Sequence, residues 1–368
     1  MTPDNPFRPS FGTSPPLLVG RDQVVLAWED ALDAGPGAPG RATLYTGVRG
    51  VGKTVMLNAA EDQACRRGWV VISETATDGL VQRLVDEGIP EVTRQLQLPA
   101  VERRISGVTL PMSLGGLDFD VHRHPAASGL RTQLNAVTDH LFAARDRPAD
   151  HPRRGARGQP TRHPPASDGV QHCFREERPV AFAAAGLPAA VDDLLRDRVL
   201  TFLRRADRQV LGPIASVEVE DALRGPIEDR GRSIDDTALV EAAEATGGYP
   251  FLIQLMGYWI WRADASRPVL DRGQVQSGLV AARRRVSALV LEPALADTSA
   301  RDRTFLRAMA QDDGPSRMAD LAARLGVDAN YASQYRLRLI AAGMIRATSH
   351  GYVDFTLPYL REHLRDQA

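Results

Sequence analysis

The spacing of apolar residues divides the first part of the chain into alternating strands and helices. Residues 41–46 and 69–73 are short apolar runs, which are typical of buried strands. Residues 22–34 and 54–67 have the pattern of helices. Strand, helix and strand in this order form a βαβ unit, so we predict an α/β domain with a parallel sheet.

The pattern continues with helices and two further strands, the first of them buried. A strand is expected at residues 180–184, ended by Gly186, and another around Val210. A hairpin is expected at residues 105–121. The predicted helices cover residues 81–97, 129–144, 189–205 and 217 to about 262.

The last part of the chain, from about residue 295, reads as helices followed by a ribbon. A short helix at residues 318–325 is closed by Gly326, and a second runs from residues 328–330 to 342. Residues 343–346 and 351–355 alternate like two strands. This order predicts a winged helix-turn-helix.

Composition narrows the functional class only slightly. The chain has 368 residues, enough for two or three domains, and a net charge of -1, which gives no general attraction to nucleic acid or anionic membranes. Two cysteines are too few for a disulfide framework, and no apolar run approaches the roughly 18 residues of a membrane span. We therefore expect a cytoplasmic protein. Residues 1–16 are polar and rich in Pro and Ser, and we interpret them as a flexible leader.

The sharpest motif follows the first strand and has the spacing of a phosphate-binding P-loop. Its glycines allow backbone N–H groups to face a phosphate, and the following helix points its positive end at the same anion. Lys53, the chain's single lysine, is expected to reach the β- and γ-phosphates, and the Thr54 hydroxyl to bind Mg²⁺. The expected cofactors are therefore ATP and Mg²⁺. The motif consists of Gly47, Val48, Arg49, Gly50, Val51, Gly52, Lys53 and Thr54.

With this motif the chain resembles the AAA+/STAND-type ATPases, in particular the archaeal-type and origin-recognition-like group, over residues 17–364. Gly20 and Arg21 match that group's entry motif, whose backbone lies near the adenine. Residues 247–251, Gly-Gly-Tyr-Pro-Phe, resemble the lid motif, whose proline, here Pro250, packs by the base; the alternative is a plain turn between lid helices. The resemblance implies a P-loop NTPase domain at residues 17–215, a helical lid at 216–290 and a winged helix at 295–368.

One part of that pattern is missing. A P-loop ATPase needs a Walker B strand that ends in Asp, often followed by Glu, to hold Mg²⁺ and polarise water. The resemblance places it between the helix at residues 129–144 and the strand at 180, but residues 143–169 contain no Leu, Ile, Val, Met, Phe, Tyr or Trp. The catalytic carboxylates are therefore not identified, and we expect nucleotide to bind but to be hydrolysed poorly.

A shift of the reading frame would explain this anomaly. When residues 145 to about 165 are read from the second base of the Arg145 codon, with CGN arginines, the permitted peptide includes Ala-Thr-Gly-Leu-Leu-Ile-Thr-Leu-Asp-Glu-Val-His. This peptide is a complete Walker B strand. The hypothesis is a frameshift, and the alternative is a disordered insertion in a degenerate ATPase. The Asp-Glu pair requires CGA codons for both Arg153 and Arg154.

Three further groups of residues are weaker candidates for functional roles. The strand expected at residue 180 ends in Ala184, Ala185 and Gly186, where the resemblance implies a polar sensor residue. An arginine finger that reaches a neighbouring subunit could come from Arg204, Arg205 or Arg208; the alternative is that these are solvated charges on a helix. The candidate DNA contacts of the winged helix are Tyr331, Gln334, Arg336 and Arg338, although acids are nearly as numerous as bases there.

These features together predict an ATP-dependent switch in which nucleotide, held between the sheet and the lid, sets how the winged helix is presented. Its partner would be DNA or a protein, and it would form nucleotide-dependent oligomers. One alternative is a DNA-binding ATPase of replication-initiator type. Another is the non-functional product of a frameshifted gene.

Overall fold

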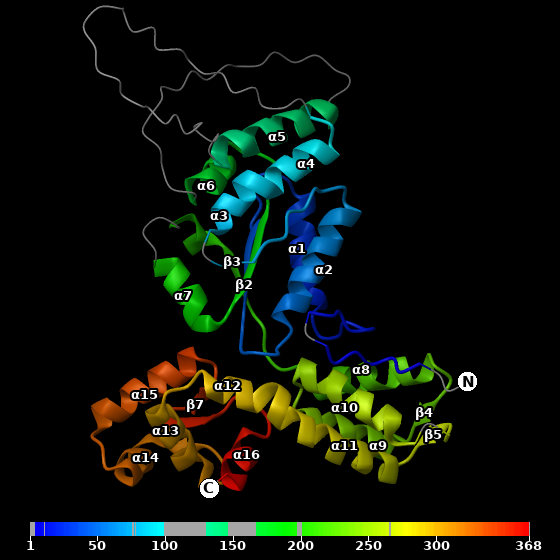
Figure 1. Ribbon diagram of the computed structural model, residues 1–368, viewed down its shortest axis with the longest axis vertical. Coiled ribbons are helices and arrows are strands. Elements are labelled where there is room, and N and C mark those ends of the chain that lie inside the picture. The colour runs from blue at the N-terminus through cyan, green and yellow to red at the C-terminus, as the bar shows by residue number, and fades with distance from the viewer. Residues whose placement is uncertain are drawn as a thin grey trace, which may run out of the picture.

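A computed structural model describes residues 4–10, 12–75, 77, 79–98, 130–145, 167–196, 201–264 and 266–367. Figure 1 shows an α/β part above, with the lid helices and the C-terminal helices side by side beneath it. No helix in these ranges is both long and apolar enough to cross a membrane.

The α/β part is built on a parallel sheet, as the sequence predicted. In the described part of the chain its order is β2-β1-β3, with β1 (Ala42–Thr46) between β2 (Phe182–Gly186) and β3 (Asp207–Val210). Thr46 lies opposite both Gly186 and Val210, so the strands end at one edge of the sheet. The chain leaves β1 at this edge and enters the P-loop.

Two helices pack beside this sheet through a shared apolar cluster. They are α1 (Asp22–Asp33) and α2 (Lys53–Arg66). Trp28 of α1 and Met56 of α2 bury their side chains in the same cluster as Tyr45 of β1. The Trp28 indole N–H also donates to the carbonyl of Ala60, at 3.0 Å, so the two helices are held together by a hydrogen bond as well as by packing.

The helices predicted at residues 81–97 and 129–144 are present, in a group at the top of Figure 1 that also contains an unpredicted helix at residues 167–175. Their small core contains Val85, Ile89 and Leu130. The hairpin expected at residues 105–121 and most of the apolar-free segment lie outside the described residues. The group comprises α3 (Leu80–Arg83), a π-helical turn (Leu84–Gly88), α4 (Ile89–Gln95), α5 (Leu130–Arg145) and α6 (Ser167–Arg175).

The strand predicted at residues 69–73 is wrong. Trp69 and Val71 do pack against the core of the sheet, but the segment has no strand partner among the described residues. Strands exist only as hydrogen-bonded ladders, and apolar pattern alone does not supply a partner. Within the same ranges β2 pairs with β1 alone, and its residues are only partly buried instead of fully buried as expected.

The lid is a helical unit, as expected, with a short parallel ladder at one end. Its helices are α8 (Ser216–Glu228), α9 (Asp236–Thr246), α10 (Pro250–Ala263) and α11 (Arg272–Val286). The ladder joins β4 (Ser233–Ile234) and β5 (Val269–Leu270). After α11, a π-helical turn (Ser287–Leu291) and α12 (Glu292–Ala296) connect the lid to the C-terminal part.

In the α/β part, α7 (Pro188–Arg196) and a 3₁₀ turn (Thr201–Arg205) lie between β2 and β3 in the chain.

The C-terminal part contains the helices and the ribbon that the sequence predicted. Gly326 ends α14 with a φ of 64°, a left-handed conformation that favours glycine. The Tyr359 hydroxyl donates to the Ala245 carbonyl of the lid, and one apolar core continues through both parts. The elements are α13 (Ala300–Ala310), β6 (Ser316–Arg317), α14 (Met318–Leu325), α15 (Ala329–Ala341), β7 (Ile345–Ser349), β8 (Tyr352–Phe355) and α16 (Leu360–Asp366), with antiparallel strand order β6-β8-β7.

The flexible leader predicted for residues 1–16 is wrong for residues 5–8, which pack on the lid. Phe7 is only 2% exposed and lies against Gly257 of α10. A Cβ atom at Gly257 would lie 2.5 Å from the ring, so the bare backbone provides the space that the ring fills. The polar composition around Phe7 concealed this single apolar anchor.

Candidate nucleotide-binding site

The P-loop backbone takes conformations that require its glycines. Gly50 and Gly52 have φ values of 74° and 95°, in the left-handed region. A Cβ atom at Gly47 would lie 2.7 Å from the carbonyl oxygen of Leu211, which follows β3. The loop therefore turns tightly at the ends of β1 and β3, and this brings its amides to the start of α2.

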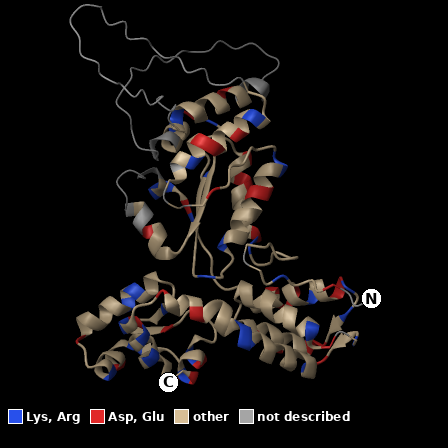
Figure 2. Ribbon diagram, viewed as in Figure 1, with Lys and Arg blue, Asp and Glu red and all other residues tan. Residues whose placement is uncertain are grey.

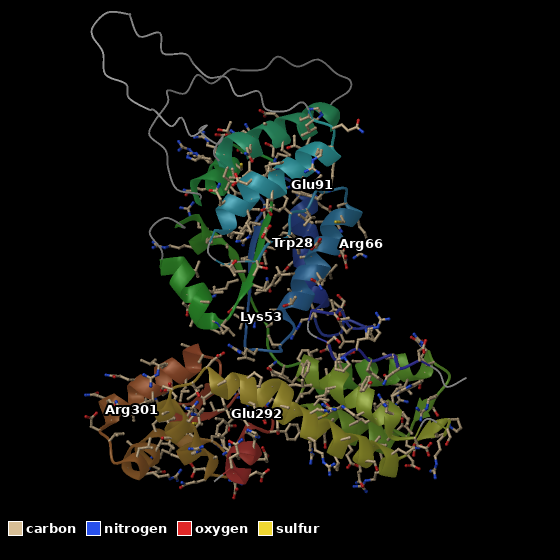
Figure 3. The ribbon with its side chains drawn as sticks, in the orientation of Figure 1. Trp28, Lys53, Arg66, Glu91, Glu292 and Arg301 are labelled. Atoms are coloured by element: carbon tan, nitrogen blue, oxygen red, sulfur yellow. The ribbon has the colours of Figure 1, made fainter. Side chains whose placement is uncertain are left out.

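Lys53 is the first residue of α2, and its ammonium group lies inside the loop. Its Nζ donates to the carbonyl oxygens of Gly47 and Val48, at 2.9 and 2.7 Å. Burial, and then the neighbouring Arg49, lower the pKa of Lys53 to about 8. Thr54 beside it is an exposed residue. Figure 3 places Lys53 at the base of the α/β part, facing the helices below.

The lid motif touches the P-loop directly. The Phe251 N–H donates to the carbonyl oxygen of Gly50, at 3.3 Å. A Cβ atom at Gly50 would lie 2.8 Å from the ring of Tyr249, and one at Gly52 would lie 3.9 Å from Pro250. The structure thus brings together two motifs that are about 200 positions apart in the sequence.

Arg21 lies next to this contact and ties three segments together. Its guanidinium donates to the carbonyl oxygens of Gly212 at 2.5 Å, Val51 at 3.5 Å and Gly20 at 3.4 Å. Burial lowers the pKa of Arg21, and the nearby Glu218 carboxylate opposes that shift. Arg21 therefore positions the P-loop and the entry segment.

A cavity lies where the P-loop, the lid and the entry segment meet. Part of its lining consists of apolar side chains. Another part is the P-loop, with its backbone amides, Lys53 and Thr54. The described residues that line it include Arg8, Arg21 and Lys53 but neither Asp nor Glu. Sequence reasoning missed a large part of this lining, namely Arg8, Pro9, Ser10, Gly12, Thr13, Pro15, Leu17, Leu18, Val19, Ile214, Ala222, Ile253 and Gln254.

The candidate arginine fingers lie elsewhere. Arg204 donates to the carbonyl oxygen of Leu195, and Arg208 forms a 2.5 Å ion pair with Asp192. Arg205 is exposed. None of these three arginines is among the described residues that line the cavity.

The candidate DNA contacts on α15 are partly engaged within the protein. Arg338 forms an ion pair of 2.5 Å with the buried Asp302, and the Tyr331 hydroxyl accepts a hydrogen bond from Arg301. Burial raises the pKa of Asp302, but its bonds to Arg338 and to Ser299 outweigh that effect and lower it. Gln334 is exposed and Arg336 is half-buried. Figure 2 shows acidic and basic residues interspersed over the helices of the C-terminal part.

The C-terminal part also reaches the P-loop. Arg49 forms an ion pair of 2.5 Å with Asp297, which directly follows α12. A Cβ atom at Gly343, just after α15, would lie 3.0 Å from the Val48 side chain. Nothing in the local sequence indicates either contact, because the partners are about 250 to 300 positions apart.

The end of β2 carries no polar sensor. Ala184, Ala185 and Gly186 end the strand, as the sequence indicated. The segment expected to contain Walker B, residues 146–166, lies outside the described residues.

Comparisons with known proteins support the fold. Residues 288–364 match a family described as a domain of unknown function, DUF8462. No curated protein sequence matches the chain. Among solved structures, the Walker-type ATPase PABY2304 of Pyrococcus abyssi is similar, with a TM-score of 0.61 and 14% identity over 95% of this chain and 96% of that chain.

A second similar structure is the ORC2 protein of Aeropyrum pernix, solved as ADPNP–ADP complexes. Its TM-score is 0.60, with 14% identity over 97% of this chain and 95% of that chain. At this identity the likeness establishes the α/β P-loop fold and nothing finer.

Proposed function

We propose that this protein is an ATP-binding switch of the AAA+ and origin-recognition-like type. The observation that carries the proposal is the cavity between P-loop and lid. Lys53 and a turn of glycine amides face it, and no carboxylate is among its described lining residues. Such a site favours a polyanion, and its apolar part suits a purine. The nucleotide complexes of the structurally similar ORC2 protein support this assignment.

Magnesium fits the same site through Thr54. Thr54 is an exposed residue at the start of α2, beside the lysine that would meet the terminal phosphates. Mg²⁺ prefers oxygen ligands and usually bridges phosphate oxygens, with few contacts to the protein. Thr54 would therefore supply one protein oxygen to a nucleotide-borne ion, and the phosphates and water would supply the others.

The switch would work through the loop itself. Val48 and Arg49 contact the C-terminal part at Gly343 and Asp297, while Gly50 accepts a hydrogen bond from the lid. A triphosphate that draws Lys53 away from the carbonyls of Gly47 and Val48 would change the loop that carries these contacts. The C-terminal part, which we interpret as a winged helix for a protein or DNA partner, would then be presented differently.

Hydrolysis is expected to be close to background. No acidic residue ends β2, and the sequence of the segment that should supply the Walker B carboxylates has none of the large apolar residues that such a strand requires. Among the described residues, the segment at 69–73 has no strand partner and β2 pairs on one side only, as the loss of a strand between them would leave them. CGA codons at both Arg153 and Arg154 are expected if the cause is a frameshift, and any other arginine codon there rules that cause out.

The switch is tested by hydrogen exchange of residues 341–346 with and without ATP and Mg²⁺. We expect nucleotide to change protection there, and the Lys53→Ala variant to lose this response. Unchanged protection in a wild-type protein shown to bind ATP would exclude the switch. Salt-dependent retardation of duplex DNA, independent of this response, would favour the replication-initiator alternative instead.

A further inference from the structure

We propose that residues 5–10 and 12–15 form a strap across the nucleotide cavity, and that Arg8 binds the phosphates of the nucleotide. The inference rests on the proposed nucleotide site. It adds to that site a wall and a cationic side chain that the P-loop and lid motifs do not contain.

The strap is fixed to the lid at its first end. Phe7 is buried against Gly257 of α10, where the absence of a Cβ makes room for the ring. The Asn5 side-chain amide donates to the carbonyl oxygen of Tyr258 at 3.0 Å. The Arg8 N–H donates to the Gln254 side-chain oxygen at 3.1 Å. The backbone of Arg8 is therefore held one helical turn beyond Pro250, the lid residue nearest to Gly52.

The other end of the strap lies on the P-loop helix. The Asn58 side-chain amide donates to the carbonyl oxygen of Gly12 at 3.0 Å and to the Ser14 hydroxyl at 3.5 Å. A Cβ atom at Gly12 would lie 4.0 Å from the Thr54 side chain. Because Asn58 is one turn after Thr54, the strap reaches α2 beside the proposed magnesium ligand.

Arg8 differs from the other two cations of the cavity in the hydrogen bonds of its side chain. Lys53 already donates to two carbonyl oxygens, and Arg21 to three. Arg8 is exposed at the cavity, and its guanidinium has no hydrogen bond or ion pair with any described residue. A free guanidinium in a cavity that a phosphate-binding loop also lines can donate two parallel hydrogen bonds to phosphate oxygens, whose geometry it matches.

The test compares Arg8→Ala with Arg66→Ala by calorimetric titration of the full chain with ATP, ADP and AMP. Both variants lose one exposed positive charge, but Arg66 lies at the far end of α2 (Figure 3). We expect Arg8→Ala to weaken ATP and ADP binding by about tenfold and AMP binding by less, and Arg66→Ala to change each by less than about twofold. Equal affinities for ATP in Arg8→Ala and in the wild type would overturn the inference.

A second variant examines the strap without removing a charge. Phe7→Ala removes the anchor on α10, and we expect it to weaken ATP binding. In the double variant, we expect Arg8→Ala to weaken ATP binding little beyond the loss that Phe7→Ala already causes. Additive losses in the double variant would mean that the anchor does not position Arg8. Lys53→Ala separates the two proposals: if it abolishes binding and Arg8→Ala has no effect, the strap fails and the nucleotide site stands. If Lys53→Ala binds ATP normally, both fail.

Discussion

Arg49, inside the P-loop, forms an ion pair of 2.5 Å with Asp297, which directly follows α12. Their side chains are 47% and 62% exposed, so water screens the attraction. Exposed pairs of this kind contribute about 1 kcal/mol or less to stability. A contact this weak is suited to a part of the molecule that exchanges between two arrangements, because a nucleotide can outweigh it.

Asp297→Asn should therefore uncouple the C-terminal part from the loop without unfolding the protein. We expect the free energy of unfolding to fall by less than about 1 kcal/mol. Exchange at residues 341–346 should rise in the absence of nucleotide, because the loop contact at Gly343 loses its neighbouring support. Asp313→Asn is the matched control, since it breaks an exposed pair with Arg365 within the C-terminal part. Identical exchange in both variants and in the wild type would argue against coupling through Asp297.

The affinity for ATP should depend on pH through Lys53. Burial and the adjacent Arg49 lower its pKa to about 8 in the free protein. Phosphate oxygens favour the ammonium form, so the pKa of Lys53 is higher in the complex than in the free protein. At pH values between these two pKa values, ATP binding is accompanied by the uptake of a proton. The affinity for ATP should therefore be highest below about pH 8 and fall by up to about tenfold per pH unit above it.

Calorimetric titrations in buffers of different ionisation enthalpy measure this proton uptake directly. A positive uptake near pH 8.5, absent in Lys53→Ala, is the expected result at protein concentrations high enough to observe residual binding. Affinity that stays constant from pH 7 to pH 9.5 would show that the Lys53 ammonium does not meet the phosphates.

Gly248→Ala should separate the lid from the P-loop domain. Gly248 has a φ of 70°, and a Cβ atom there would collide with the carbonyl oxygen of Ile214. Gly231→Ala is the control, because Gly231 has a φ of 75° but nothing near its Cβ position. In urea denaturation we expect Gly231→Ala to cost about 1 kcal/mol of backbone strain and Gly248→Ala to cost about 3 kcal/mol or more. Equal costs would mean that Gly248 is not tightly packed against Ile214.

Local chemistry explains what the sequence could predict. The P-loop was recognisable because each of its residue types has a backbone or phosphate role at a fixed position, and the turn before α2 fulfils it with left-handed Gly50 and Gly52. Gly326 likewise closes α14 as its position indicated. In these places a few neighbouring residues determine the conformation.

The features that were missed depend on distant partners. Residues 69–73 have the composition of a strand but lack a ladder in the described structure. Phe7 lies in a polar segment, and only the space above Gly257 makes it an anchor. The strap therefore could not be distinguished from a flexible leader, and Arg8 and Ser10 were not recognised as part of the cavity.

The most direct test of the account is calorimetric titration of ATP with Mg²⁺ into the wild-type protein and into Lys53→Ala. Lys53 is the chain's single lysine, so no neighbouring lysine can replace it. The account predicts saturable binding of one nucleotide per chain, weakened by at least about 100-fold in the variant because two or more charge-assisted hydrogen bonds are lost. Equal ATP affinity in the two proteins, or no binding by the wild type, would contradict it.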